Sequence, residues 1–274
     1  MKFHSACRVG VLLAMVAGMS FVGIATSASA QGVPVPTGQT FSQCPVGHRV
    51  SPGNGSVYIC VVGVAEEGTI DIGALDTTFK GPGVVQGGTG SCLCATLTWA
   101  QALDGVSYSA PKQLLAMSVL ALLGYPSGIT PPAQSQVYVE TVQAGPMLFG
   151  IANGGVVTVV PLSFRLVNPL LGSNCYVGTL SDPVVLNLTT ATSGSLTGTL
   201  GYAYSFAGGL YTVGTEVVDN QFTVPAATGC GSGGVWDSAI TALEGADTPG
   251  SNSAILYGNY ALATAKWVKH QLHT

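Results

Sequence analysis

The chain has 274 residues, in which eight lysines and arginines stand against twelve aspartates and glutamates. Charged residues make up 7% of the sequence, about a quarter of the share usual in soluble domains. Nucleic-acid binding needs a clustered basic face, so these few scattered basic residues exclude that class of partner. Thr, Ser, Asn and Gly fill the polar positions, a composition that suits exposed faces of β-sheet and equally a protein embedded in an envelope.

Residues 1–30 are typical of a cleavable export signal. Lys2 and Arg8 form a basic start, an apolar run follows over 9–25, and small residues precede a cleavage site between Ala30 and Gln31. The run is interrupted and shorter than the roughly 20 apolar residues of a spanning helix, which argues against an uncleaved anchor. Removing Lys2 and Arg8 leaves six basic against twelve acidic residues, so we expect an exported domain over 31–274 with a net charge of −6.

The exported part contains an even number of cysteines, which in an oxidising compartment predicts three disulfides. They are Cys44, Cys60, Cys92, Cys94, Cys175 and Cys230. We favour a bond between Cys44 and Cys60, which bracket a turn-rich loop. We also favour a bond between Cys175 and Cys230, which would tie together the two ends of a run of strands.

Cys92 and Cys94 remain after these two pairings. In an extended strand their sulfurs share a face but lie too far apart to bond each other. A mutual bond would need a strained turn and would be easily reduced, as in a redox switch. The simpler interpretation is that each cysteine bridges to another strand or stays unbonded.

Two-residue alternation of apolar and polar side chains dominates the rest of the chain and predicts strands. The predicted strands are 57–64, 69–72, 137–142, 160–166, 184–188, 196–206, 210–218, 222–224 and 255–263. Pro161 indicates an edge or a bulge, and Gly208 with Gly209 indicates a hairpin turn. Many short strands with few helices predict a mainly β fold, an antiparallel β-sandwich or a barrel-like sheet with one or two short helices.

Two stretches depart from this alternation. Residues 112–123 are apolar all round and end at Gly124, which predicts a buried helix too short to cross a bilayer, with a buried pair of strands as the competing assignment. Residues 236–245 predict a short amphipathic helix, with Trp236 on its apolar side and Asp237 near its start, where the helix dipole favours an acid.

Few residues offer chemistry. His48 is expected in a surface loop, and His270 and His273 in a frayed C-terminal tail. A serine or cysteine nucleophile needs a positioned base, and a zinc site needs at least three protein ligands. We therefore assign no catalytic residue, no metal ligand and no cofactor, and we favour a non-catalytic role over an enzymatic one.

Acidic residues near the first predicted strands are candidates for a pair of catalytic carboxylates and for a calcium site. Glu66 and Glu67 are adjacent, so on a regular strand they would face opposite ways and could not share a substrate. Together with Asp71 and Asp76 they offer hard oxygens for calcium, but their spacing matches no calcium-binding loop. We interpret them as solvated acids at strand ends.

Aromatic side chains gather on one face of the strand 196–206. Leu200, Tyr202, Tyr204 and Phe206 alternate there, and Tyr211 lies across the predicted turn. These five residues predict either an apolar groove, a girdle of a barrel, or ordinary core packing across a hairpin.

Several blocks resemble a family of uncharacterised secreted proteins of actinobacteria. They are NPLLGSNCYVG within 167–178, the stretch 182–190, DNQFTVPAATGCG within 218–231, the stretch 250–258 and, more loosely, 68–73 and 86–88. The resemblance implies an exported, mostly β protein in which Cys175 bonds to Cys230. It supplies no activity or catalytic residue, and neither Cys92 with Cys94 nor the segment 112–123 fits its pattern.

The sequence therefore predicts a secreted, disulfide-stabilised, β-rich protein with a non-catalytic binding, adhesive or structural role at or near the cell surface. The main alternative is an envelope-embedded β-barrel or a carrier of apolar ligands, and a secreted hydrolase comes third. The partner is not identified; a cell-envelope component and an apolar small molecule are both compatible with the composition.

Overall fold

The computed structural model describes residues 41–53, 55–73, 75–90, 97–118, 132–152, 155–244 and 251–272, which all fall within one compact unit, Pro34–Thr274. The predicted signal at 1–30, Cys92, Cys94 and His273 lie outside these ranges. Within them, every helix is too short or too polar to cross a lipid bilayer.

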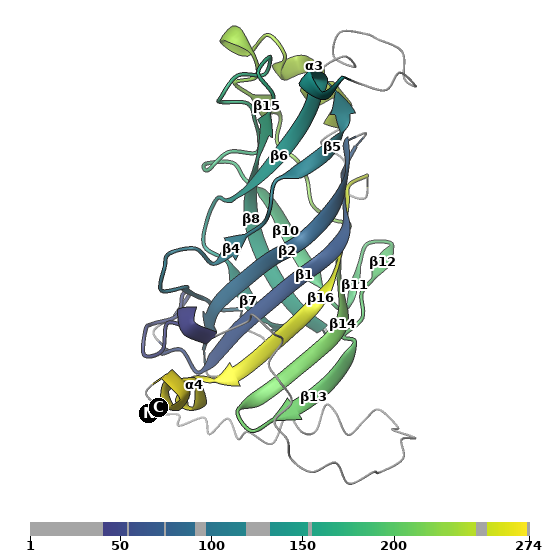
Figure 1. The fold of residues 1–274 in the computed structure, drawn as a ribbon. Coiled ribbons are helices and arrows are strands. Elements are labelled where there is room, and N and C mark those ends of the chain that lie inside the picture. The colour runs from purple at the N-terminus through teal and green to yellow at the C-terminus, as the bar shows by residue number, and fades with distance from the viewer. Residues whose placement is uncertain are drawn as a thin grey trace, which may run out of the picture. The chain divides into compact units, whose positions relative to one another are not determined.

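The fold is mainly β, as the alternation predicted: one large antiparallel sheet is curled as a half-barrel, and two short α-helices accompany it (Figure 1). The first eight strands are β1 Ile59–Ile72, β2 Leu75–Thr89, β3 Ala100–Gln101, β4 Tyr108–Ser109, β5 Gln113–Ser118, β6 Gln136–Gln143, β7 Leu148–Ala152 and β8 Gly155–Val167. The others are β9 Tyr176–Val177, β10 Val184–Thr189, β11 Thr192–Ser193, β12 Leu196–Thr197, β13 Tyr202–Phe206, β14 Gly209–Asp219, β15 Ala227–Thr228 and β16 Ser253–Thr264. The helices are α3 Asp237–Glu244 and α4 Ala265–Leu272, with single 3-10 turns at Phe41–Gln43, Ala133–Ser135 and Ser232–Gly234.

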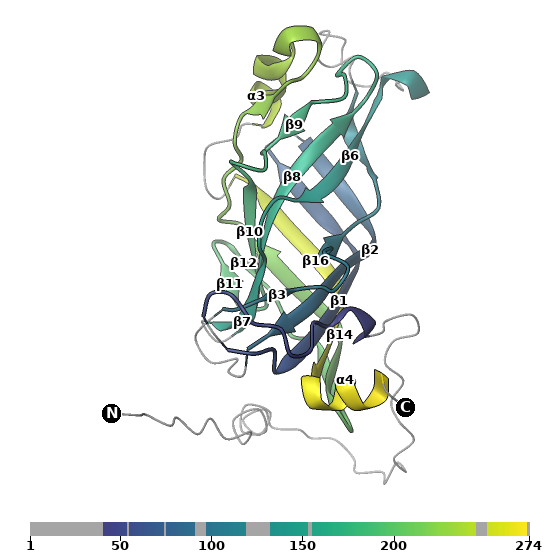
Figure 2. The ribbon, with the colours of Figure 1, turned by 90° about the vertical axis from the view of Figure 1, so that its left-hand side faces the viewer.

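The strand order explains how one sheet encloses a core. From β2 it runs through β1, β16, β14 and β10 to β8, and β6 and β5 continue it beyond β8. In Figure 2, β6, β8 and β9 face the viewer while β1, β2 and β16 run behind them. Side chains from both walls meet in between, among them Val61, Phe149, Leu162 and Leu186, all at most 1% exposed. Of the two predicted arrangements, a β-sandwich and a barrel-like sheet, the structure has the barrel-like one.

Alternating burial along each strand follows from this arrangement. In β10, Val184 and Leu186 are buried in the core while Val185 and Asn187 are exposed. Pro161 lies in β8 between Leu162, the last residue that pairs with β6, and Val159, the first that pairs with β7. Its missing N–H is therefore not needed by a neighbouring strand there, and its carbonyl accepts a bond of 2.8 Å from Ala144.

The two ends of the curled sheet, β2 and β5, meet through a side chain. The amide of Gln113 accepts a hydrogen bond from the Lys80 N–H at 3.0 Å and donates one to the Lys80 carbonyl at 2.9 Å. A carboxamide carries the same donor and acceptor as a peptide group, so Gln113 takes the place of a strand neighbour. Nearby, Gln143 of β6 accepts a bond of 3.0 Å from the N–H of Tyr108 in β4.

A second, smaller core lies on the outside of the sheet. Outward side chains of β1 and β16, such as Val62 and Ala263, are covered there by the segment before β1 and by α4. The ring of Trp267 in α4 lies 6.3 Å from that of Phe41 and 5.3 Å from that of Phe206. The predicted frayed tail is thus wrong up to residue 272, because one face of α4 has an apolar surface to bury.

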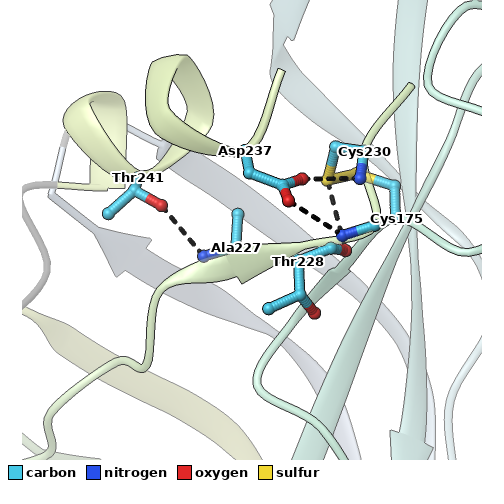
Figure 3. Close-up of a disulfide and its surroundings, with 7 residues drawn as sticks. Cys175, Ala227, Thr228, Cys230, Asp237 and Thr241 are labelled. Atoms are coloured by element: carbon cyan, nitrogen blue, oxygen red, sulfur yellow. Dashed lines mark hydrogen bonds between the residues drawn. A yellow bond between two sulfur atoms is a disulfide. The ribbon is translucent and has the colours of Figure 1, made fainter. Parts of the chain in front are cut away.

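Both favoured disulfides are present. Cys44 is bonded to Cys60 of β1, and Cys175, just before β9, is bonded to Cys230, just after β15. Figure 3 shows how helix α3 is joined to the second bond: Asp237 accepts hydrogen bonds from the backbone N–H of Cys230 at 2.6 Å and of Gly229 at 3.2 Å. The predicted helix 236–245 is confirmed as α3 over its described part, with Asp237 in its first turn, where its carboxylate bonds the loop before the helix.

Three sequence predictions are wrong. The predicted helix 112–123 begins instead with strand β5; Gln113 and Leu115 are buried while Leu114 is 50% exposed, because pairing with β6 imposes a period of two. Residues 119–123 lie outside the described ranges. The strand 196–206 is divided into β12 and β13, with Gly201 at φ +66° between them, and 222–224 forms no strand although Phe222 is buried.

Candidate functional site

Apart from Glu66 and Glu67, the candidate residues for catalysis or metal binding do not come together among the described residues. In the part of the chain that the structure describes, no three His, Cys, Asp or Glu side chains are grouped so that they could hold a metal ion. His48 and His270 are both exposed, the first in the loop before β1 and the second on α4. Asp71 accepts a hydrogen bond of 3.0 Å from Ser253, and the Asp76 side chain lies outside the described part.

The interior of the half-barrel is filled. Two cavities of about 30 Å³ each lie inside it, and Ile70 and Phe79 line both. Sites for small organic ligands usually measure about 300–1,000 Å³. Each cavity is therefore of the size of a water molecule, and the interior gives no support to carriage of an apolar ligand.

Polar groups nevertheless line the first cavity, among them Tyr108, Thr158 and Tyr260. Burial raises the pKa of Tyr260 to about 12, and a smaller opposing effect comes from Thr158. Burial likewise raises the pKa of Tyr108 to about 12, opposed by the Thr141 hydroxyl. The Thr158 hydroxyl lies close to that of Tyr260 but has no partner in a hydrogen bond of standard geometry among the described residues.

We expect Thr158→Val to raise the free energy of unfolding by about 1 kcal/mol, because it removes a buried hydroxyl without a partner and conserves shape. Urea titration measures the change. The control is Thr212→Val: the buried Thr212 hydroxyl donates to the Tyr260 carbonyl and accepts from the Tyr260 N–H at 3.2 Å, so its loss should cost about 1–2 kcal/mol. Equal losses in both variants would show that Thr158 is satisfied in solution, for example by an ordered water.

The outer surface of β1, β16, β14 and β13 carries a different set of side chains. These four strands lie side by side (Figure 1). We define the tyrosine–glutamate face by eight residues on them: Glu66, Glu67, Tyr202, Tyr204, Tyr211, Glu216, Tyr257 and Asn259.

A β-bulge brings two of the acids to this face. Pairing of β1 with β16 shifts register between Ala65 and Glu67, so Glu66 is the extra residue. Asn259 donates a hydrogen bond of 2.7 Å to Glu66, and Glu67 stands opposite Tyr257, two residues before Asn259 on β16 and so on the same face. The expectation that Glu66 and Glu67 face opposite ways is thus wrong, because it assumed a regular strand.

One row of the face alternates acid and aromatic residues. Tyr257 lies between Glu67 of β1 and Glu216 of β14, and its hydroxyl donates to Glu216 at 3.2 Å. Partial burial raises the pKa of Tyr257, and the charges of Glu216 and Glu67 raise it further. The tyrosine hydroxyl therefore stays protonated as a donor, and both carboxylates add to a local negative potential.

A neighbouring row is formed by the cross-strand pair of Tyr204 and Tyr211. Burial raises the pKa of Tyr211, followed by the charge of Glu66 and the Tyr204 hydroxyl. Tyr202, two residues before Tyr204, shares its face and is 76% exposed. The face thus combines wide, accessible aromatic rings with carboxylates.

The five residues of the predicted apolar groove are divided by the structure. Leu200, Tyr202 and Tyr204 are exposed, whereas Phe206 and Tyr211 are half-buried against the outer core. None of them lines either interior cavity. Core packing is thus the wrong interpretation for Tyr202 and Tyr204, because nothing among the described residues covers the hairpin there.

The acids of this face differ from Glu140 on β6 in their ionic contacts. Glu140 lies 3.7 Å from the ammonium of Lys112 and 3.2 Å from the guanidinium of Arg165. Among the described residues, no basic group comes within 4.0 Å of Glu66, Glu67 or Glu216.

Comparison of the chain with protein-family models, with curated proteins and with solved structures finds no match. A role must therefore be inferred from the side chains themselves: the sheet carries hydrogen-bond acceptors, tyrosine donors and exposed aromatic rings, which together suit recognition of a partner.

Proposed function

We propose that the chain is an exported, non-catalytic binding protein that acts at or near the cell surface and recognises its partner through the tyrosine–glutamate face. The observation that carries the proposal is the exposure of Tyr202 and Tyr204 beside three glutamates in a protein whose charged share is only 7%. Tyrosine is enriched in binding surfaces because it combines large apolar area with a polar end at low entropic cost.

Export rests on the sequence. The predicted signal and the resemblance to secreted proteins of actinobacteria both support it, and membership of that family is itself part of the proposal. Two disulfides are compatible with an oxidising compartment outside the cytoplasm. A rigid, disulfide-linked sheet also supports binding, because its face needs little ordering when a partner arrives.

The test follows the tagged full-length chain in the organism that encodes it. We expect N-terminal sequencing of the exported protein to begin at Gln31, and washed cells to retain part of it. Tyr202→Ser with Tyr204→Ser should lower that retention by at least about fivefold, since truncated aromatic contacts at an interface centre commonly cost more than 1 kcal/mol.

The matched control is Tyr58→Ser, because Tyr58 is 42% exposed, close to the 46% of Tyr204, but lies outside the face. Retention of this variant should equal that of the unchanged chain. Equal retention of the Tyr202 and Tyr204 variant, with normal export, would contradict the proposal.

A further inference from the structure

We propose that the partner is cationic: an extended peptide segment of another protein, with lysine or arginine side chains at alternate positions, that adds beside β13. It places those side chains beside Tyr202 and Tyr204, at the margin of the tyrosine–glutamate face where Glu216 of β14 is the nearest of the three acids in strand order. This inference rests on the proposed function and specifies its partner. Three observations on different parts of the molecule support it.

The first is the distribution of charge. Three of the twelve acids in the chain lie on this face, and no basic group among the described residues pairs with them. Lys80 of β2 stands opposite Glu67 of β1 in the strand pairing but forms no ion pair with it. A negative face of this kind attracts a cationic partner and disfavours an anionic one.

The second is a contact that the protein already makes elsewhere. The ammonium of Lys112, just before β5, lies 5.0 Å from the centre of the Tyr138 ring and 3.7 Å from Glu140, both on β6. A lysine is thus held between a tyrosine ring and a glutamate. The face offers the same pair of groups at Tyr257 and Glu216, which are joined by a hydrogen bond of 3.2 Å. Among the described residues, no basic side chain forms an ion pair with this glutamate.

Attraction of a cation to an aromatic ring contributes about 0.5–1 kcal/mol at an exposed site and more where water is displaced. The carboxylate beside the ring adds a Coulomb attraction that is weak alone and screened by salt. Several such contacts along one segment are needed for measurable affinity. An alternating arrangement supplies them, because every second side chain of a strand faces the same way.

The third observation is the free edge of β13. Phe206 and Gly209 flank a two-residue turn, so they and the pair of Tyr204 with Tyr211 are the hydrogen-bonded pairs of the hairpin. The N–H and C=O groups of Ala203 and Ser205 therefore point away from β14. Among the described residues, β13 pairs with no other strand.

This edge lacks the usual protection against strand addition. Residues 202–206 contain no proline and no charged side chain, which are the common means of blocking an edge. A strand added here would lie about 4.8 Å from β13. Its alternate side chains would stand directly beside Tyr202 and Tyr204, within reach of a lysine or arginine head group.

A second copy of the same chain is a weaker occupant for this edge. Residues 202–206 are themselves uncharged, so a copy pairing through its own β13 would bring no cation to the face. It would instead extend the sheet with a second set of the same three glutamates. Charge complementarity therefore selects a basic segment.

The experiment measures fluorescence anisotropy of short labelled peptides with the mature chain at low ionic strength. The peptides alternate threonine with lysine, with glutamine or with glutamate. We expect the lysine peptide to bind, the other two to bind at least about fivefold more weakly, and added salt to weaken the lysine peptide most. Glu216→Gln should weaken its binding by about fivefold or more.

The control variant is Glu140→Gln, which changes the net charge by the same amount as Glu216→Gln but lies on β6. Its binding of the lysine peptide should match that of the unchanged chain. If Glu140→Gln and Glu216→Gln weaken binding equally, net charge and not the face is responsible, and the inference is overturned. Absence of binding by the lysine peptide, or sedimentation showing a dimer that Tyr204→Lys disrupts, would also overturn it.

Failure of this inference is distinguishable from failure of the proposed function. Equal binding of the lysine and glutamine peptides, lost on Tyr202→Ser with Tyr204→Ser, would reject the cationic partner and leave the face as a binding surface. Retention on cells that is unaffected by the tyrosine substitutions would reject the proposed function itself.

Discussion

Alkali is expected to destabilise the protein by about 5 kcal/mol in total as the pH rises from well below 10 to well above 12. Tyr108 and Tyr260 line the interior cavity, and burial raises the pKa of each from 10.0 to about 12. Each unit of pKa difference between the folded and unfolded states corresponds to about 1.4 kcal/mol. Two tyrosines with two units each therefore give the stated loss, comparable to the 5–15 kcal/mol stability of a typical domain.

The direction of the effect follows from where the protons are held. Below pH 10, both the folded and the unfolded chain keep both tyrosines protonated, so the contribution is fully present. As the pH rises from 10 towards 12, the unfolded tyrosines lose their protons first, which favours the unfolded chain. Once the pH is well above the folded-state pKa of about 12, no more is lost.

Urea titrations at a series of pH values measure this loss, with tryptophan fluorescence as the probe. Tyr108→Phe with Tyr260→Phe should remove most of the decline above pH 10, because phenylalanine does not ionise. Tyr202→Phe, at an exposed site, should leave it unchanged. A decline of the same size in the double phenylalanine variant would show that other groups cause alkaline unfolding.

Removal of the bond between Cys175 and Cys230 is expected to cost about 4 kcal/mol of stability. The bond closes a loop with a sequence separation of 55 residues, and the chain-entropy relation converts that length into roughly 4 kcal/mol. The same relation gives about 3 kcal/mol for the bond between Cys44 and Cys60, whose separation is 16. Thermal and urea unfolding of the two double alanine variants measure both costs.

The order of the two costs is the informative result. Cys175→Ala with Cys230→Ala also leaves Asp237 bonded to a less constrained loop, so helix α3 should be held less firmly against that loop (Figure 3). Reduction of both bonds in the unchanged chain should lower its stability by nearly the sum of the two losses. A larger loss from the Cys44 and Cys60 variant would mean that loop length does not determine the stabilisation.

Elements with a clear period could be predicted from the sequence. Strand β10 alternates over 184–188 and strand β16 over 253–258, because one face of each is buried against the core. The long strand β2 was not predicted, because it contains several glycines and Pro82, which usually end strands. Gly83 is needed there, since a Cβ atom would lie 2.6 Å from the Phe79 ring.

The candidate site was only partly visible in the sequence. Tyr202, Tyr204 and Tyr211 could be grouped from the hairpin pattern, because a two-residue turn fixes their register. Glu66, Glu216 and Tyr257 could not be, since their proximity depends on the pairing of β16 with both β1 and β14. The bulge at Glu66 has no signature in composition, and the exposure of the face depends on what the rest of the chain does not cover.

In this protein, the curvature of the sheet and the contact between its strands β2 and β5 depend on different residues. The curvature of the sheet is encoded along whole strands such as β1 and β2, where every residue pair contributes to the ladder. Among the described residues, the hydrogen bonds that join β5 to β2 come from one side chain, that of Gln113, whose carboxamide imitates a peptide group. Evolution or a protein designer can therefore change how firmly this edge is held by altering one residue, while the geometry of the remaining sheet is preserved.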